Sequence, residues 1–257
     1  MTNHAPTQRF SDRVTHYARY RPSYPTAVLA CLRDEWGLAE TAVVADIGSG
    51  TGLLTRLFLD NGNPVYGVEP NAEMRTAGEG FLADYPHFTS VNGTAEATTL
   101  PDHSVDFVVA GQAAHWFAPE PTRAEWQRIL KPGGHIALVW NTRHVDGSDF
   151  MRAYERILVA YARDDTGRPR REGGHERGPE FILGDSHQFR SFVNVQQFDY
   201  AGLEGRTLSS SMMPLTGHPH YEPMLAALRE LFNEYQVDGR VTVLYTTELY
   251  MSHKLSL

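Results

Sequence analysis

Apolar and polar residues alternate along the chain in a pattern typical of strands followed by amphipathic helices. Short apolar runs predict strands at 43–47, 65–69, 88–91, 105–110 and 135–140. Between them, apolar residues at helical spacing predict helices at 53–61, 71–84 and 121–130. Because these strands are apolar on both faces, the pattern favours a parallel sheet with helices on both sides.

Further elements are predicted at both ends of this core. Upstream, residues 12–20 and 26–36 predict two helices, and prolines follow the first. Downstream, the pattern predicts helices at 150–161 and 221–235 and strands at 193–199 and 241–251. The segment 163–178 is rich in Gly, Arg and Glu, which favours an irregular loop.

Composition and charge narrow the class of protein. The formal net charge is −8, with 31 Asp and Glu against 23 Lys and Arg, which argues against a nucleic-acid partner. No apolar run approaches the ~20 residues of a membrane span, and residues 1–10 lack the apolar stretch of a secretory signal. The single cysteine, Cys31, has no partner for a disulfide, and the twelve histidines show no metal-site spacing. We therefore expect a cytoplasmic protein without a metal.

A glycine-rich turn, DIGSGTG at 46–52, lies between the first predicted strand of the core and the helix that follows. Glycines at positions 48 and 50 let the backbone approach a ligand without an intervening side chain. The next helix begins with unpaired N–H groups that favour an anionic group. Strand, turn and helix together predict a ligand-binding turn.

An acidic residue, Glu69, closes the next predicted strand. A carboxylate at this place can accept both hydroxyls of a ribose, as it does in dinucleotide-binding folds. Proteins that bind NAD and proteins that bind S-adenosylmethionine share this arrangement. The NAD fingerprint G-x-G-x-x-G, however, would need a third glycine where this chain has Leu53. An NAD-dependent oxidoreductase remains the alternative.

The chain resembles the class I S-adenosylmethionine-dependent methyltransferases, in the branch of trans-aconitate methyltransferase-like (type 11) proteins. The segments that carry the resemblance are YARYRPSYP (17–25), VVADIGSGTG (43–52), VEPNAEM (68–74), GTAEATTLPDHSVDFV (93–108), AHWF (114–117) and RILKPGG (128–134). It implies a Rossmann-like, doubly wound, mostly parallel seven-stranded sheet whose last strand is antiparallel, with an N-terminal helical lid. It implies one domain over 1–257, with a cap at 9–36, a cofactor-binding core at 42–141 and acceptor-side elements at 142–257.

The resemblance implies S-adenosylmethionine as the cofactor. Glu69 would bind the ribose hydroxyls, and Asp46 would help to hold the methionine ammonium group. Thr94 departs from the family pattern, in which many relatives have an acid that meets the adenine amino group. The full implied set is Tyr17, Arg21, Asp46, Gly48, Ser49, Gly50, Glu69, Pro70, Ala95, Glu96 and Gln112.

The acceptor implied by the resemblance is a small molecule, with a carboxylate favoured. His115 is the candidate general base, with a packed histidine as the alternative. Trp116 and Tyr20 would border the acceptor. Arg143 could clamp an anion or simply be a surface arginine. A non-catalytic protein that binds S-adenosylmethionine is the second alternative function, and the oligomeric state cannot be read from the residues.

Overall fold

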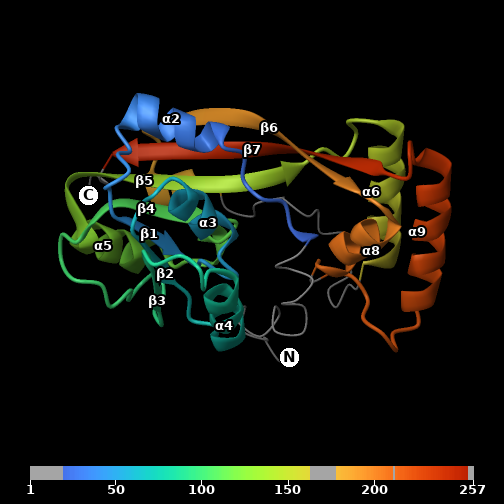
Figure 1. The fold of residues 1–257 in the computed structure, drawn as a ribbon, viewed down its shortest axis with the longest axis horizontal. Coiled ribbons are helices and arrows are strands. Elements are labelled where there is room, and N and C mark those ends of the chain that lie inside the picture. Colours follow the sequence, from blue (N-terminus) through green and yellow to red (C-terminus); the bar gives the residue numbers. More distant parts are fainter. Residues whose placement is uncertain (1–19, 163–177, 211, 254–257) are drawn as a thin grey trace.

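A seven-stranded sheet organises the computed structural model, which describes residues 20–162, 178–210 and 212–253 (Figure 1). The strands are β1 (Val44–Ile47), β2 (Val65–Val68), β3 (Phe88–Val91), β4 (Val105–Gly111), β5 (Leu130–Arg143), β6 (Gln188–Phe198) and β7 (Val241–His253). Their order across the sheet is β3-β2-β1-β4-β5-β7-β6, and β7 runs antiparallel to both neighbours. The pairs from β3 to β5 are parallel. The predicted mostly parallel, doubly wound sheet with an antiparallel last strand is therefore confirmed.

Helices connect these strands, and several begin or end at residues suited to that role. The helices are α2 (Ala27–Trp36), α3 (Leu53–Asp60), α4 (Ala72–Phe81), α5 (Pro119–Ile129), α6 (Asp149–Tyr161), α7 (Glu180–Leu183), α8 (Tyr200–Leu208) and α9 (Tyr221–Tyr235), with a 3₁₀ turn η3 (Ala114–Trp116). Gly37 ends α2 in the left-handed conformation, with φ of 68°. The Asn71 side chain accepts a hydrogen bond from Met74 N and so caps α4.

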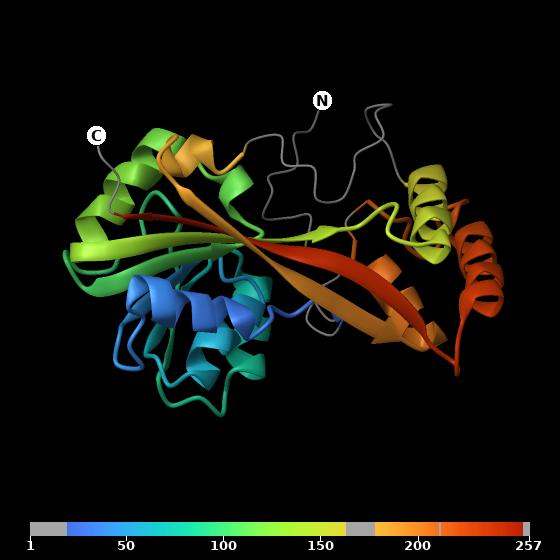
Figure 2. The same ribbon diagram turned by 90° about the horizontal axis from the view of Figure 1, so that it is seen from above.

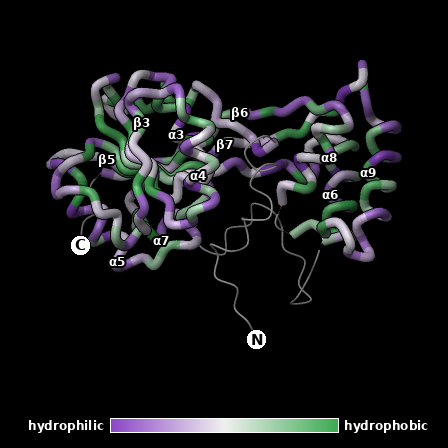
Figure 3. The backbone as a smooth tube through the Cα atoms, turned by 60° about the horizontal axis from the view of Figure 1, so that its bottom comes forward, coloured by the Kyte–Doolittle hydropathy of each residue, from purple (hydrophilic) through white to green (hydrophobic). Residues whose placement is uncertain are grey.

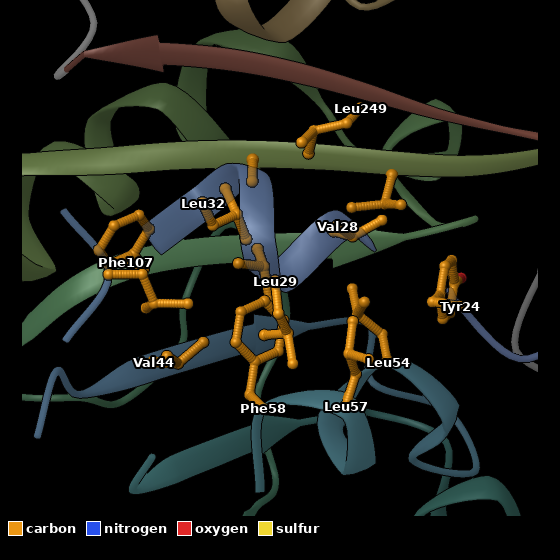
Figure 4. Close-up of a cluster of buried hydrophobic side chains, with 14 of the residues drawn as sticks. Tyr24, Val28, Leu29, Leu32, Val44, Leu54, Leu57, Phe58, Phe107 and Leu249 are labelled. Atoms are coloured by element: carbon orange, nitrogen blue, oxygen red, sulfur yellow. The ribbon is translucent and has the colours of Figure 1, made fainter. Parts of the chain in front are cut away.

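Two apolar layers hold the helices on the sheet. On one face, α2 and α3 pack against β1, β4 and β7 through residues such as Leu32, Phe58 and Leu249 (Figure 4). On the other face, α5 and α7 cover β1, β4 and β5, with Trp126 fully buried. Figure 2 shows these helices on opposite sides of the sheet. The arrangement leaves the carboxyl ends of the parallel strands open for a site.

The strands β5, β6 and β7 extend beyond this core and carry a second group of helices (Figures 1 and 2). Pairing continues to Arg143 opposite Tyr245 and to Phe198 opposite Val241. Helices α6, α8 and α9 enclose a separate apolar cluster there, which includes Leu228 of α9. We call this part, α6, α8, α9 and the adjoining strand ends, the helical lobe. Figure 3 shows hydrophobic stretches on its helices as well as in the sheet.

The strand limits differ from the prediction on this side of the sheet. β5 was predicted over 135–140, but it begins at Leu130, because residues 131–134 form a bulge rather than a turn. β4 pairing passes from Val105 opposite Leu130 to Phe107 opposite His135, which leaves that segment unpaired. β6 begins at Gln188, ahead of the predicted 193, because its first residues are exposed at the sheet edge and show no buried alternation.

The pattern missed one helix of the helical lobe, and two predicted segments lie almost entirely outside the described residues. Helix α8 was not predicted, since its two glycines lower the helical propensity. Gly205 is required there because a Cβ at this position would lie 2.1 Å from the Tyr20 ring. The predicted helix over 12–20 lies outside the described residues except for Tyr20, and the predicted loop over 163–178 lies outside them except for Gly178.

No helix within the described ranges combines the length and the apolarity that crossing a membrane requires.

The helical lobe should depend on its own apolar cluster for stability. Leu228 is fully buried there, so Leu228→Ala should lower the free energy of unfolding by about 2–5 kcal/mol through lost burial and a cavity. Glu230→Ala, at an exposed position of the same helix, should change it by less than about 0.5 kcal/mol. Denaturant unfolding measures both. Equal effects would show that α9 does not pack as described.

Candidate functional site

A cavity of about 300 Å³ opens at the carboxyl ends of β1, β2 and β4. Ligands bind at this edge in open α/β sheets, because the connecting loops diverge there. Its walls come from the glycine-rich turn after β1, the end of β2, the segment 94–96 and the segment 111–117. The lining residues are Tyr24, Asp46, Gly48, Ser49, Gly50, Thr51, Leu53, Leu54, Glu69, Pro70, Asn71, Met74, Thr94, Ala95, Glu96, Gly111, Gln112, Ala113, Trp116 and Phe117.

The glycine-rich turn presents bare backbone to the cavity. Gly48 and Gly50 have φ of 68° and 57°, in the left-handed region that other residues rarely adopt. A Cβ on Gly48 would lie 2.7 Å from Ala113 Cβ, and one on Gly50 would lie 3.2 Å from Met74 Cε. Larger residues at either position would therefore strain the backbone and close the space that a ligand could use.

Asp46 lies at the base of the cavity with no solvent exposure. Its Oδ2 accepts a hydrogen bond of 2.6 Å from the Thr55 hydroxyl, and its Oδ1 has no hydrogen-bond partner within the described part of the chain. Burial raises the pKa of Asp46 to about 7, and the nearby Glu69 adds to this rise, whereas the Thr55 hydrogen bond opposes it. A cation or donor that enters the cavity would satisfy the unpaired oxygen.

Glu69 joins the end of β2 to the glycine-rich turn. Its Oε2 accepts from Gly50 N at 3.0 Å, and its Oε1 accepts from Asn71 N at 2.8 Å. Burial raises the pKa of Glu69, while these two backbone hydrogen bonds and the charge of Arg75 lower it. Each carboxylate oxygen retains a further lone pair. The fixed side chain can therefore accept two adjacent hydroxyl groups from a ligand.

The remaining predicted cofactor residues in the described chain, apart from Arg21, also line the cavity. Glu96 Oε1 accepts from Ala118 N at 2.9 Å, which fixes this acid at the wall. Gln112 has a φ of 57°, unusual for a residue with a side chain, and its Nε2 donates to Asn141 O at 3.1 Å. Ser49, Pro70 and Ala95 complete this group of lining residues.

The predicted acceptor-side residues are divided between the cavity and its surroundings. Trp116 lines the cavity and is 42% exposed, whereas His115 packs against its ring at 4.8 Å and is not a lining residue. Tyr20 and Arg21 lie against α8 instead: Tyr20 contacts Gly205, and Arg21 Nη2 donates to Ser209 O at 3.3 Å. Tyr17 lies outside the described residues.

Arg143 is buried in the helical lobe, so it is not a surface arginine. It is 6% exposed, its Nη2 lies 2.6 Å from Glu155 Oε2, and its guanidinium stacks 5.4 Å from the Tyr154 ring centroid. Its Nε and Nη1 have no hydrogen-bond partner. The side chain borders a second, water-sized cavity next to Ser210 and Met213 rather than the large one.

Several lining residues were missed from the sequence, and Tyr24 is the most informative. It belongs to the segment YARYRPSYP that was singled out, but its neighbours were chosen instead. A Cβ on Gly111 would lie 2.5 Å from the Tyr24 hydroxyl, so the ring lies directly against the end of β4. Among the described residues, no three His, Cys, Asp or Glu side chains are grouped to hold a metal ion.

Residues 45–138, which contain the glycine-rich turn and most of the cavity wall, match the family model described as Methyltransferase domain. An uncharacterized methyltransferase-like protein of Schizosaccharomyces pombe is 34% identical over 156 residues, which cover 60% of this chain and 59% of that protein. An uncharacterized methyltransferase of Mycobacterium bovis is 41% identical over 135 residues, or 52% of each chain. The chain thus spans little more than half the length of these relatives.

Solved structures share the fold over nearly the whole chain. A protein of Anaeromyxobacter dehalogenans assigned as a type II methyltransferase has a TM-score of 0.65 at 21% identity and covers 93% of this chain and 100% of its own. Phosphoethanolamine N-methyltransferase 2 of Haemonchus contortus, solved with S-adenosylhomocysteine, has a TM-score of 0.53 at 16% identity and covers 96% of this chain and 58% of its own. These structures share the fold of this chain, and the family model covers residues 45–138 within that fold.

The raised pKa of Asp46 predicts a pH-dependent stability. Its pKa is about 7 in the folded chain and near 3.8 when unfolded, so the folded state binds the extra proton between these values. Its contribution to stability is complete below about pH 4 and is lost as the pH rises through 7. Asp46→Asn cannot lose this proton, so the variant should gain stability relative to the natural chain from pH 5 to pH 7.5.

The free energies of unfolding of the natural chain and of Asp46→Asn, measured without ligand at pH 5 and at pH 7.5, test this prediction. The free energy of unfolding of the variant minus that of the natural chain should be larger at pH 7.5 than at pH 5 by more than about 1 kcal/mol. A difference that is the same at both pH values would mean that Asp46 is not held in a desolvated environment.

Proposed function

We propose that this chain transfers the methyl group of S-adenosylmethionine to a small-molecule acceptor. The observation that carries the proposal is the meeting of a bare-backbone turn, a buried unpaired carboxylate oxygen and a fixed acid in one cavity. These three features suit an amino acid joined to a nucleoside. The match of residues 45–138 to the methyltransferase domain model supports the same ligand.

The residues of the cavity fit each part of this cofactor. Glu69 would accept the ribose hydroxyls, since both of its oxygens are already oriented by backbone N–H groups. Asp46 would receive the methionine ammonium group at its unpartnered Oδ1. Gly48, Ser49 and Gly50 would lie along the methionine and ribose, and Gln112 would lie at the methionine end. Pro70, Ala95 and Glu96 would surround the adenine.

The protein would act chiefly by alignment. The bound cofactor supplies a methyl group on a sulfonium, which is already activated for an in-line displacement. Holding the acceptor in line with it and excluding water can contribute several kcal/mol, up to ~7–11. Trp116, at the partly exposed side of the cavity, would form a wall for the acceptor. His115 would serve as the general base for an acceptor that must lose a proton.

We favour a carboxylate among small-molecule acceptors, working in the cytoplasm, on the resemblance to the trans-aconitate methyltransferase-like branch. A carboxylate needs no base, but it needs a cation. Arg143 has two guanidinium nitrogens without a hydrogen-bond partner among the described residues, and it would supply the cation to an acceptor that extends from the large cavity into the helical lobe, where Arg143 pairs with Glu155. Tyr20 and Arg21 contact the helical lobe at Gly205 and Ser209, and they, together with Tyr17, would border the acceptor and the methionine.

Binding of S-adenosylhomocysteine, measured by calorimetry, tests this function against NAD-dependent oxidation and reduction. The natural chain should bind S-adenosylhomocysteine and not NADH. Glu69→Ala should weaken the binding about tenfold or more, because hydrogen bonds to a charged group are lost. Glu73→Ala removes an equal charge from an exposed position in α4 and should leave the affinity unchanged.

Unchanged affinity in Glu69→Ala would rule out the proposed contact with the ribose. Tight binding of NADH with no binding of S-adenosylhomocysteine would replace the proposed function with that of an oxidoreductase.

A further inference from the structure

Residues 20–24, which we call the strap, lead from the helical lobe to the cofactor cavity. Tyr20 contacts Gly205 in α8, whereas Tyr24 lines the cavity beside Gly111. In Figure 1 the strap is the dark blue stretch just before α2. Residues 21–25 belong to no helix or strand, so their backbone carbonyls need partners from elsewhere.

Side-chain amides from β5 and β6 provide those partners. Asn194 Nδ2 donates to Ser23 O at 2.8 Å, and Asn141 Nδ2 lies 3.3 Å from both Pro22 O and Ser23 O. Gln196 Nε2 donates to Tyr20 O at 3.3 Å. Three amides, from the two strands that flank β7, thus hold three carbonyls along five residues of chain.

The two asparagines are themselves fixed by Thr247 of β7. The Thr247 hydroxyl donates to Asn141 Oδ1 at 2.5 Å and lies 3.2 Å from Asn194 Nδ2, while Asn194 Nδ2 also contacts Asn141 Oδ1 at 3.0 Å. All three side chains are at most 9% exposed. In such a buried network the loss of one member leaves the others unsatisfied, which costs more than the hydrogen bond itself.

The network also reaches the cavity from its other side. Asn141 O accepts from Gln112 Nε2, and Gln112 lines the cavity next to Gly111. Tyr24 is 8% exposed and lies against this same point, close to Leu54. The asparagine pair therefore connects to the cavity twice, through the strap that carries Tyr24 and through Gln112. Asn194 itself is not a lining residue.

We propose that Asn194 and Asn141 are positioning residues for the methyl-transfer site and that Tyr24 contacts the bound cofactor. The inference rests on the proposed function, because the ligand is the one proposed above. Asn194 lies on the edge strand of the sheet, and it acts on the ligand through the strap. Because Gln112 donates to the backbone carbonyl of Asn141, substitution of the Asn194 side chain leaves that contact in place and weakens cofactor binding through the displacement of Tyr24.

Calorimetric binding of S-adenosylhomocysteine to the full chain, at a temperature where every variant is folded, tests this. Asn194→Ala and Tyr24→Ala should each weaken binding about five- to tenfold, as expected for about 1–1.4 kcal/mol. Gln197→Ala removes an exposed amide from the same strand and should bind like the natural chain. Thr247→Val keeps the side-chain shape and should weaken binding in the same direction, which provides a second variant if Asn194→Ala fails to fold.

The double variant separates positioning from a purely structural role. If Asn194 acts through Tyr24, Asn194→Ala combined with Tyr24→Ala should bind no more weakly than Tyr24→Ala alone. The same comparison applies to Thr247→Val. The inference would be overturned if the losses of affinity multiply in the double variant. It would also be overturned if Asn194→Ala lowers the melting temperature but leaves the affinity unchanged.

The outcome also separates this inference from the proposed function. If the natural chain binds S-adenosylhomocysteine and the asparagine and threonine variants bind it equally well, only the positioning role fails. If the natural chain does not bind it, both proposals fail together.

Discussion

The Glu69 carboxylate is the interaction on which the candidate site depends. It accepts one backbone N–H from the turn after β1 and one from the start of α4, so a single side chain fixes two loops from neighbouring strands. Without it, the glycine-rich turn would keep its left-handed residues but lose the bond that orients Gly50. The same carboxylate is proposed to bind the ligand, so the structure of the turn and the recognition of a ribose depend on one group.

The carboxylate of Asp46, unlike that of Glu69, is only partly hydrogen-bonded before a ligand binds. Glu69 is satisfied by backbone donors before any ligand arrives, whereas Asp46 is buried with one oxygen unpaired. An uncompensated buried polar atom reduces stability, and such a cost is typical of a place where a ligand completes the structure. Glu69 is therefore oriented in advance to accept the hydroxyls of a neutral diol, whereas Asp46 has an oxygen that a cation would satisfy.

Because β5 and β7 are long, one sheet carries both the cavity and the helical lobe, which would form the acceptor side. β5 and β7 run on past the core, so the helical lobe and the cavity are attached to one continuous ladder. Asn141 and Arg143 illustrate the transition along β5. Asn141 holds the strap beside the cavity, and two residues further on Arg143 is buried in the helical lobe. A change in the lobe can therefore reach the cavity through a rigid strand.

The sequence predicted the core well, because its signals are local. Short runs of apolar and β-branched residues specify β1 to β4, Asn71 caps α4, and Gly37 ends α2. The ligand-facing turn was recognisable because its glycines must adopt positive φ.

The features of the fold and of the site that were not predicted depend on tertiary contacts, which a local sequence pattern does not contain. The Lys131–Gly134 segment has the residues of a turn but forms a bulge inside β5, since the strand resumes pairing at His135. Helix α8 contains Gly205 because the Tyr20 ring occupies the space that a Cβ would need, a contact that lies far away in the sequence. The pattern ended the fifth strand at 140, so it did not show that β5 runs on to Arg143 or that this arginine is buried against Glu155 and Tyr154. Tyr24 was passed over because several aromatic and basic residues compete in one short segment.

A crystal structure of the chain with S-adenosylhomocysteine would test the central claim most directly. The account predicts the ribose hydroxyls on Glu69, the amino group of the ligand at Asp46, and the amino-acid end between Gln112 and Tyr24. A cavity that stays empty at saturating ligand, or one that holds the pyrophosphate of a dinucleotide against the glycine-rich turn, would contradict it.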